Sequence, residues 1–379
     1  GIHTATHLTS GSTHGTQTFL PHYGNHKNHS HPVINTRTIS LEKISFYLYN
    51  IGNITQERNL FIMKKHLCFF LCSLLVFLTG CSHSQTIRFG AADIGGMYYS
   101  FANSYSGFAS KDNESYKFEV KNTAGSAANL RLLSDHYIDL GIAQTDLIQD
   151  AYNGRNAFEN NICRGYKAVS SLYTEACQIV VRGDSDIQTL DDLQGRKVSI
   201  GAAESGTERN AKEILSFSGL NDQLVETVNL DYTKAASMLA SGKIDAFFCT
   251  AGIRTTVIDE LNKECKIRLL SIDEKCMKKL QKAYPFYVKY TIPANTYSGQ
   301  STQVETLGVK SILLASDNLS DETVKEITRL LFKHGKDMQY ATSLNLNLDE
   351  KTATHGVTIP FHPGAASYYK DKGITVTTK

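Results

Sequence analysis

The chain has 379 residues, of which 20% are charged and 41% hydrophobic. This ordinary globular composition and length are enough for two domains. The formal net charge is +2, but residues 1–81 hold six of the 39 Lys and Arg and only two of the 37 Asp and Glu. The remaining 33 basic and 35 acidic side chains give no basic excess, so we expect no nucleic-acid partner.

Residues 1–62 do not resemble a folded domain, because histidines are scattered among Thr, Ser, Gly and Asn. We expect this segment to be disordered, or to be upstream sequence translated from a misplaced start. A histidine-rich metal tract is the alternative, but its spacing is irregular and no cysteine or acidic residue lies near these histidines. Zinc-ligand spacing is also absent, so we predict no metal site and no cofactor.

Residues 63–80 have the features of a lipoprotein signal peptide. A basic head, Met63–His66, precedes twelve apolar residues, Leu67–Leu78, which are too few to span a bilayer as a helix. The run ends in Leu-Thr-Gly-Cys, which resembles the bacterial lipobox. A buried core helix is the alternative. We expect translation to start at Met63, and a lipid on Cys81 to anchor the protein to a membrane face outside the cytoplasm.

Five cysteines follow Cys81, with no CxxC pair among them: Cys163, Cys177, Cys249, Cys265 and Cys276. A core of this size does not need a disulfide scaffold. A bridge between Cys265 and Cys276 and free buried thiols both remain open.

The chain after residue 85 alternates strand and helix patterns. We predict strands at 86–90, 116–122 and 140–143, with helices at 97–110, 127–134 and 147–153. The strand ends present Gly95 and Gly96, Ser126, and Gln144. Ligands in open α/β sheets lie beyond the carboxyl ends of strands, so these groups could converge. Helix N-capping is the alternative role for Ser126.

Two strand-like segments, 166–173 and 178–182, then lead into a second region of the same kind. We predict strands at 198–200, 224–229, 246–249 and 267–272, with helices at 232–241, 255–263 and 273–283. Residues 286–292 and 304–315 return as strands, and helices follow at 320–334 and from 362. The fold class is therefore α/β, with one lobe of residues 86–175 and 300–379, and a second of residues 176–299.

Val198–Leu215 is the stretch with the strongest binding signal. A short strand enters a small-residue turn, and a helix starts at Ser205-Gly206-Thr207. The first amides of such a helix are unpaired, and its dipole favours a carboxylate or phosphate. A similar turn, 90–96, precedes the helix at residue 97. Two facing helix starts would hold a small anion; two ordinary βα turns are the alternative.

Eight short motifs occur in order between residues 86 and 374: Gly95–Tyr99, Gly125–Leu132, Asp139–Gln144, Ala151–Gly154, Ser205–Thr207, Asp245–Phe248, Tyr284–Tyr287 and His362–Ala365. Together they resemble solute receptors of the TAXI type, the binding subunits of one class of TRAP transporters. The resemblance implies a type II periplasmic-binding-protein fold, with a hinge and an interlobe cleft. It also implies capture of a small organic acid, such as glutamate or a dicarboxylate, for a separate membrane permease. Met97 stands where a hydroxyl residue is common in that family, so the identity of the substrate stays open.

The strand-end and helix-start pattern, together with the family resemblance, predicts nine ligand-binding residues: Gly96, Tyr98, Ser126, Gln144, Tyr173, Ser205, Gly206, Thr207 and Thr250. Each has a structural alternative, such as capping for Ser205 or a plain core position for Tyr98. Arg209 fits a solvated position on its helix better than a pairing role. His362 fits a structural turn at a helix start.

These features favour a non-enzymatic, lipid-anchored receptor in the periplasm or cell envelope. A ligand-sensing lipoprotein with a membrane signalling partner is one alternative. A hydrolase using Ser205 or Ser126 is another, although no Gly-x-Ser-x-Gly elbow is present.

Overall fold

The computed structural model describes residues 41–78, 84–342, 346 and 348–379. The chain divides into two units, Gly1–Cys81 and Ser82–Lys379. In the first unit, a single helix, α1 (Leu41–Leu78), runs through Met63. Residues 41–62 are therefore helical, whereas we expected no regular structure there; this stretch has no proline to interrupt a helix. Residues 1–40 and the lipidation residue Cys81 lie outside the described residues. Among the residues that the structure describes, no helix combines the length and apolarity needed to cross a membrane.

The second unit contains one sheet with the strand order β2-β1-β3-β10-β4-β7-β5-β6, while β8 pairs with β4 and β9 pairs with β10. The strands are β1 (Gln85–Gly90), β2 (Tyr116–Lys121), β3 (Leu140–Gln144), β4 (Tyr166–Arg182), β5 (Lys197–Ser199), β6 (Glu226–Val228), β7 (Ala246–Ala251), β8 (Ile267–Leu269), β9 (Val288–Ile292) and β10 (Val304–Ser316). The sets β2-β1-β3 and β7-β5-β6 are each parallel. Each set therefore directs its strand ends, and the helix starts that follow them, to one edge of the sheet.

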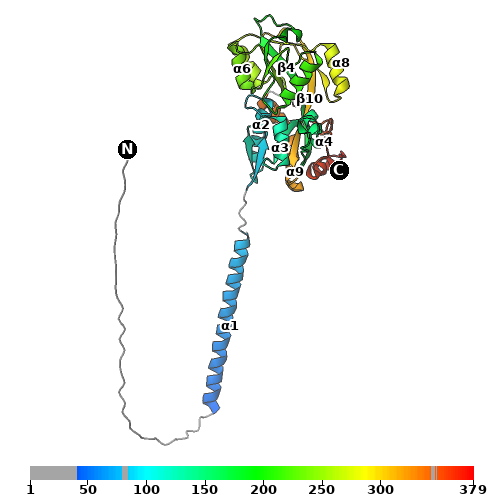
Figure 1. Ribbon diagram of the computed structural model, residues 1–379. Coiled ribbons are helices and arrows are strands. Elements are labelled where there is room, and N and C mark those ends of the chain that lie inside the picture. The colour runs from blue at the N-terminus through cyan, green and yellow to red at the C-terminus, as the bar shows by residue number, and fades with distance from the viewer. Residues whose placement is uncertain (1–40, 79–83, 343–345, 347) are drawn as a thin grey trace, which may run out of the picture. The chain divides into compact units, whose positions relative to one another are not determined.

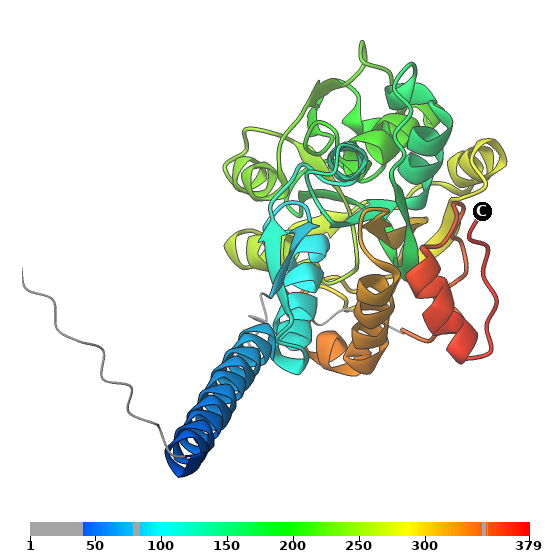
Figure 2. The same cartoon turned by 90° about the horizontal axis from the view of Figure 1, so that it is seen from below.

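The helices of this unit connect the strands and cover the sheet (Figure 1). They are α2 (Met97–Asp112), α3 (Ser126–Ser134), α4 (Thr145–Asn153), α5 (Gly206–Phe217), α6 (Tyr232–Ala240), α7 (Thr256–Glu264), α8 (Glu274–Ala283), α9 (Asp321–Lys333), α10 (Gly335–Thr342) and α11 (Pro363–Asp371), with short 3₁₀ turns at Asn156–Phe158 and Asp191–Leu193. Figure 2 shows α11 beside α9, where the rings of Phe332 and Tyr368 stack with centroids 5.5 Å apart.

Two long antiparallel strands, β4 and β10, run through both halves of this unit (Figure 1). One end of β10 pairs with β3 and the other with β9, while the second part of β4 pairs with β7. The sequence predicted two strands where β4 is continuous, because Thr174 and Glu175 interrupt the apolar pattern. Two α/β halves joined by crossing strands confirm the predicted fold class, which is α/β and type II periplasmic-binding-protein-like.

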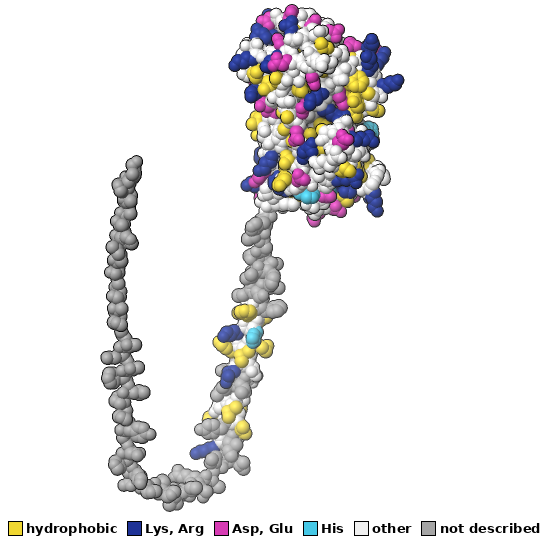
Figure 3. Space-filling model, in the orientation of Figure 1, with side chains coloured by type: hydrophobic (Ala, Val, Ile, Leu, Met, Phe, Trp, Pro, Cys, Tyr) yellow, Lys and Arg dark blue, Asp and Glu magenta, His cyan; other side chains and the backbone are white. Residues whose placement is uncertain are grey.

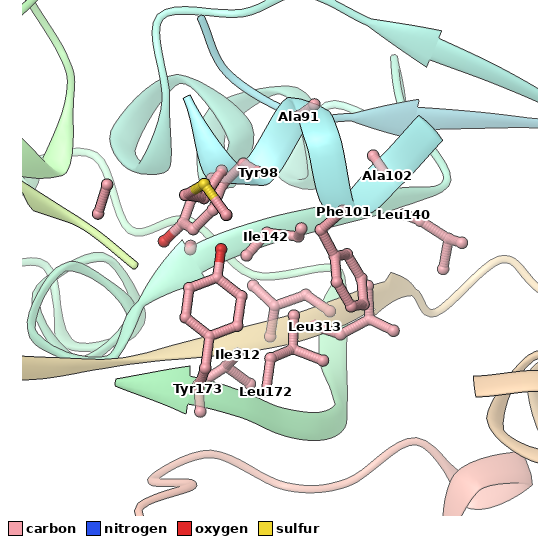
Figure 4. Close-up of a cluster of buried hydrophobic side chains, with 14 of the residues drawn as sticks. Ala91, Tyr98, Phe101, Ala102, Leu140, Ile142, Leu172, Tyr173, Ile312 and Leu313 are labelled. Carbon is pink, nitrogen blue, oxygen red and sulfur yellow. The ribbon is translucent and has the colours of Figure 1, made fainter. Parts of the chain in front are cut away.

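The apolar core continues from one half to the other. The larger buried cluster includes Phe101 and Leu313 of the first half, and also Phe247 and Ile258 of the second. Figure 4 shows part of this cluster between α2, β3, β4 and β10. A second cluster, which includes Ile214 and Leu280, lies under α5 and α8. The halves are thus packed together on one side.

Candidate ligand-binding site

A cavity lies where helix starts from both halves meet. Eight of the nine predicted ligand-binding residues line it: Gly96, Tyr98, Ser126, Gln144, Ser205, Gly206, Thr207 and Thr250. The starts of α2 and α5, which the sequence predicted as a facing pair, therefore open onto one shared cavity.

Tyr173 is the predicted residue that does not line the cavity. Its ring is buried and points from β4 toward Tyr98, as Figure 4 shows. Its hydroxyl has no hydrogen-bond partner among the described residues. Tyr173 thus supports the residues behind the cavity and does not face its interior.

The start of α5 is fixed by capping. Ser205 is the N-cap residue, and its Oγ accepts a hydrogen bond from the Glu208 N–H at 3.0 Å. Capping was the structural alternative for this residue. The Ser205 hydroxyl hydrogen is still free to donate, because an accepting hydroxyl keeps its own proton.

The hydroxyl of Thr207 connects α5 to β7. It accepts from the Thr250 N–H at 3.2 Å, and lies 2.5 Å from the Tyr232 hydroxyl. Tyr232 donates to the Thr250 carbonyl at 3.0 Å, so Thr207 must donate to Tyr232. This closed network holds Thr207 in place and leaves the Thr250 hydroxyl oxygen with no partner among the described residues.

The end of β3 brings Gln144 against the start of α5. A Cβ added to Gly206 would lie 2.3–2.5 Å from the Gln144 side chain, so only glycine allows this approach. The Gln144 N–H donates to the Ser126 Oγ at 3.1 Å, and Gly125, not Ser126, is the N-cap of α3. The capping role considered for Ser126 is therefore wrong. The buried Gln144 Oε1 has no partner in the described part of the chain.

The cavity is lined by three carboxyl groups, from Asp93, Glu175 and Asp231, and its described lining includes no Lys, Arg or His. Two of these groups cap α6. Asp93 Oδ2 accepts from the Tyr232 N–H and Asp231 Oδ1 from the Lys234 N–H, each at 2.7 Å. The outer surface, by contrast, mixes both signs of charge on the face shown in Figure 3.

Sequence reasoning missed several lining residues, Asp93, Asp231, Tyr232 and, most notably, Glu175. It is 2% exposed, and Tyr98 donates to its Oε2 at 2.9 Å. Burial raises the pKa of its carboxyl to about 8. The available signal was an acidic residue between the strand-like segments 166–173 and 178–182, since buried charges are uncommon outside functional sites.

The two halves also cap each other's helices beside the cavity. The Glu204 carbonyl accepts from the Ala127 and Ala128 N–H groups at the start of α3, at 3.1 and 3.3 Å. Glu204 adopts a left-handed conformation, with φ of 64°, and its carboxylate pairs with Arg131 at 3.1 Å. In return, Asp93 of the first half caps α6 of the second.

A second buried cluster between the halves centres on Arg209, whose side chain is 11% exposed. It pairs with Asp146 and Asp150 of α4 and with Glu213 of its own helix. The expectation that Arg209 is solvated is therefore wrong, because α4 packs acidic residues against it. Even so, burial raises the pKa of Glu213 to about 7.

Two other sequence expectations are resolved by the structure. His362 caps α11, since its Nδ1 accepts from the Gly364 N–H at 3.2 Å, which confirms the structural turn. Cys265 and Cys276 are both free thiols.

Comparison with solved structures finds proteins of low identity. The periplasmic aliphatic sulphonate binding protein SsuA from Escherichia coli is 17% identical, with 75% of this chain and 78% of that chain covered and a TM-score of 0.41. The alkanesulfonate-binding protein SsuA from Xanthomonas axonopodis pv. citri is 16% identical, with 76% and 90% covered and a TM-score of 0.42. A putative L-cystine ABC transporter from Listeria monocytogenes is 16% identical, with 68% and 94% covered and a TM-score of 0.42. These values are too low to carry a conclusion about a ligand.

One protein family matches this chain over most of the second unit. Residues 89–373 match the NMT1-like family, and this range includes every residue that lines the cavity. The chain therefore belongs to the NMT1-like family.

Proposed function

We propose that this chain is an extracytoplasmic solute-binding protein that captures a small organic ligand between its two halves. The observation that carries the proposal is the cavity that helix starts from both halves line. A ligand enclosed there would contact both halves at once, so it would stabilise their closed arrangement.

Within this function, we propose a TAXI-type receptor that delivers its ligand to a TRAP membrane permease. The support is the ordered set of sequence motifs, several of which contribute residues to the cavity. The ligand would be a small organic acid, such as glutamate or a dicarboxylate, with a carboxylate at the start of α5. There the amides of Gly206 and Thr207 and the helix dipole favour negative charge. Periplasmic location, cleavage after residue 80, a lipid on Cys81 and the lobe boundaries at 175/176 and 299/300 are part of this proposal.

We propose no catalytic activity for this site. The hydroxyl groups of Ser205 and Ser126 accept hydrogen bonds from backbone amides. No histidine is found among the described residues around the cavity, so neither serine has a neighbouring imidazole base.

The test combines native mass spectrometry of the purified full chain with a thermal-shift panel of amino acids and dicarboxylic acids. We expect a bound solute and a raised Tm, since ligand at 100 times its Kd adds about 2.7 kcal/mol of stability. Gly206→Val should abolish the shift, because the added side chain would displace Gln144. Gly107→Ala is the control, since its Cβ would meet nothing within 4 Å. No bound solute and no shift with any compound would contradict the proposal.

A further inference from the structure

The cavity contains buried oxygen atoms that can accept a hydrogen bond from a ligand. Gln144 Oε1 and Thr250 Oγ1 are buried and without partners among the described residues. The Glu175 carboxyl receives one hydrogen bond from a neutral phenol, that of Tyr98. These groups come from β3, β7 and β4, so three separate strands direct acceptors to one place.

Gln144 and Glu175 are neighbours within this set. The Gln144 side chain is close enough to act on the Glu175 carboxyl by hydrogen bonding, which lowers its pKa against the larger effect of burial. Gln144 Oε1 has no hydrogen-bond partner among the described residues, so it can accept one from a ligand. A donor with several N–H groups could therefore contact both side chains.

The carboxyl of Glu175 has no cationic partner, since no described residue lining the cavity is Lys, Arg or His. The other two carboxyl groups, of Asp93 and Asp231, are already used to cap α6. A buried carboxylate without a counter-charge is costly. Glu175 is thus the one lining carboxyl group, among the described residues, that lacks a structural task suited to its charge.

We propose that the ligand carries a protonated amine, which donates hydrogen bonds to the Glu175 carboxylate and to Gln144 Oε1. This inference rests on the proposed function and narrows it, because the carboxylate of the same ligand would lie at the start of α5. An amino acid or a similar zwitterion meets both requirements. A dicarboxylate meets only one, and would bring its second charge toward Glu175.

The experiment compares ligands that differ only by the amine. Isothermal titration calorimetry of the full chain would measure L-glutamate against glutarate and L-alanine against propionate, within a panel of amino acids and their deaminated counterparts. We expect an amine-bearing member to bind at least about 100-fold more tightly than its counterpart, because charge-assisted hydrogen bonds are the strong ones. This comparison needs no variant, so it does not depend on whether a substitution folds.

Glu175→Gln provides the second comparison, because glutamine keeps the shape and removes the charge. We expect amine affinity to fall at least about tenfold in this variant, with cooperative thermal unfolding retained. Glu119→Gln is the matched control, since Glu119 pairs with Lys121 on the exposed face of β2, and should leave affinity unchanged.

Three results would overturn the inference. Glutarate binding as tightly as glutamate would overturn it and leave the proposed function standing. Unchanged amine affinity in a folded Glu175→Gln protein would do the same. Absence of binding by every member of both classes would overturn the proposed function together with the inference.

Discussion

Two places in the second unit bury carboxyl groups between the halves, and they differ in what faces those groups. At the first, Arg209 pairs with Asp146, Asp150 and Glu213. At the second, Glu175 lines a cavity whose described lining offers it only neutral groups and other acids. The first place is an ion cluster in which the protein supplies the cation. The second lacks a cation and has space for one, which is why we assign ligand binding to it.

The largest expected effect comes from removing the cation of the first place. Arg209→Met should lower the free energy of unfolding by about 3–5 kcal/mol, because it leaves buried carboxyl groups unpaired. Urea denaturation at pH 7 would measure this loss. Lys212→Met is the control, because Lys212 is exposed and pairs with Glu208 on the same helix, so about 0.5 kcal/mol or less is expected. A loss for Arg209→Met as small as that control would show that the cluster is not a structural one.

The second effect is a pH dependence that belongs to Glu175. Its pKa is about 8 in the folded protein, against 4.5 as the ordinary value. Between these values the folded state binds more protons than the unfolded state. As far as Glu175 determines it, the free energy of unfolding is therefore highest at low pH, where the carboxyl is neutral in both states. It falls as the pH rises toward 8.

Relative to Glu175→Gln, the ligand-free wild type should lose up to about 1.4 kcal/mol per pH unit between pH 5 and 8. Tyr98, Tyr173 and Asp146 also act on this group, and all three are present in both proteins. The measurement is the free energy of unfolding of both proteins across this pH range. Parallel curves would mean that Glu175 is not held in a low-dielectric environment.

The smallest effect tests whether the Asp231 carboxylate only caps α6 or also contacts the ligand, as we propose for Glu175. Asp231→Ala should lower the free energy of unfolding by about 1 kcal/mol, because α6 loses its N-cap. Asp231→Ser keeps an accepting oxygen, and should restore most of that stability with ligand affinity unchanged. Asp273→Ala removes the equivalent cap of α8, away from the cavity, and calibrates the loss. Tenfold weaker ligand binding by a stable Asp231→Ser protein would assign Asp231, and not Glu175 alone, to the ligand.

Local sequence signals predicted most of the fold and much of the cavity lining. The turns before α2 and α5 are short, rich in small residues and next to their helices, so the sequence contains both the strand end and the helix start. The parallel order of the strands then brings these starts together. This is why Gly96, Ser205, Gly206 and Thr207 could be placed without any knowledge of distant contacts.

What the sequence could not show depends on packing between segments far apart in the chain. Glu175 lies between the two predicted strand segments, and the hydrogen bond that it accepts from Tyr98 of α2 joins residues 77 positions apart, so no local pattern shows its burial. Arg209 appears solvated on its own helix, and only the approach of α4 makes it buried. An N-cap role was considered for Ser126 for the same reason: its hydroxyl oxygen accepts instead from the backbone N–H of Gln144, which ends β3.

The reciprocal caps beside the cavity have a consequence for the protein without its ligand. If the halves move apart, the start of α3 loses the Glu204 carbonyl and the start of α6 loses Asp93, and water hydrates the freed amides. Exchanging a water for a protein acceptor gains only about 0.5–1.5 kcal/mol per hydrogen bond. These hydrogen bonds therefore fix how the halves align, but they contribute little to the free energy that keeps the halves together. The apolar core and the Arg209 cluster also join the halves, so a bound ligand would add to these contacts.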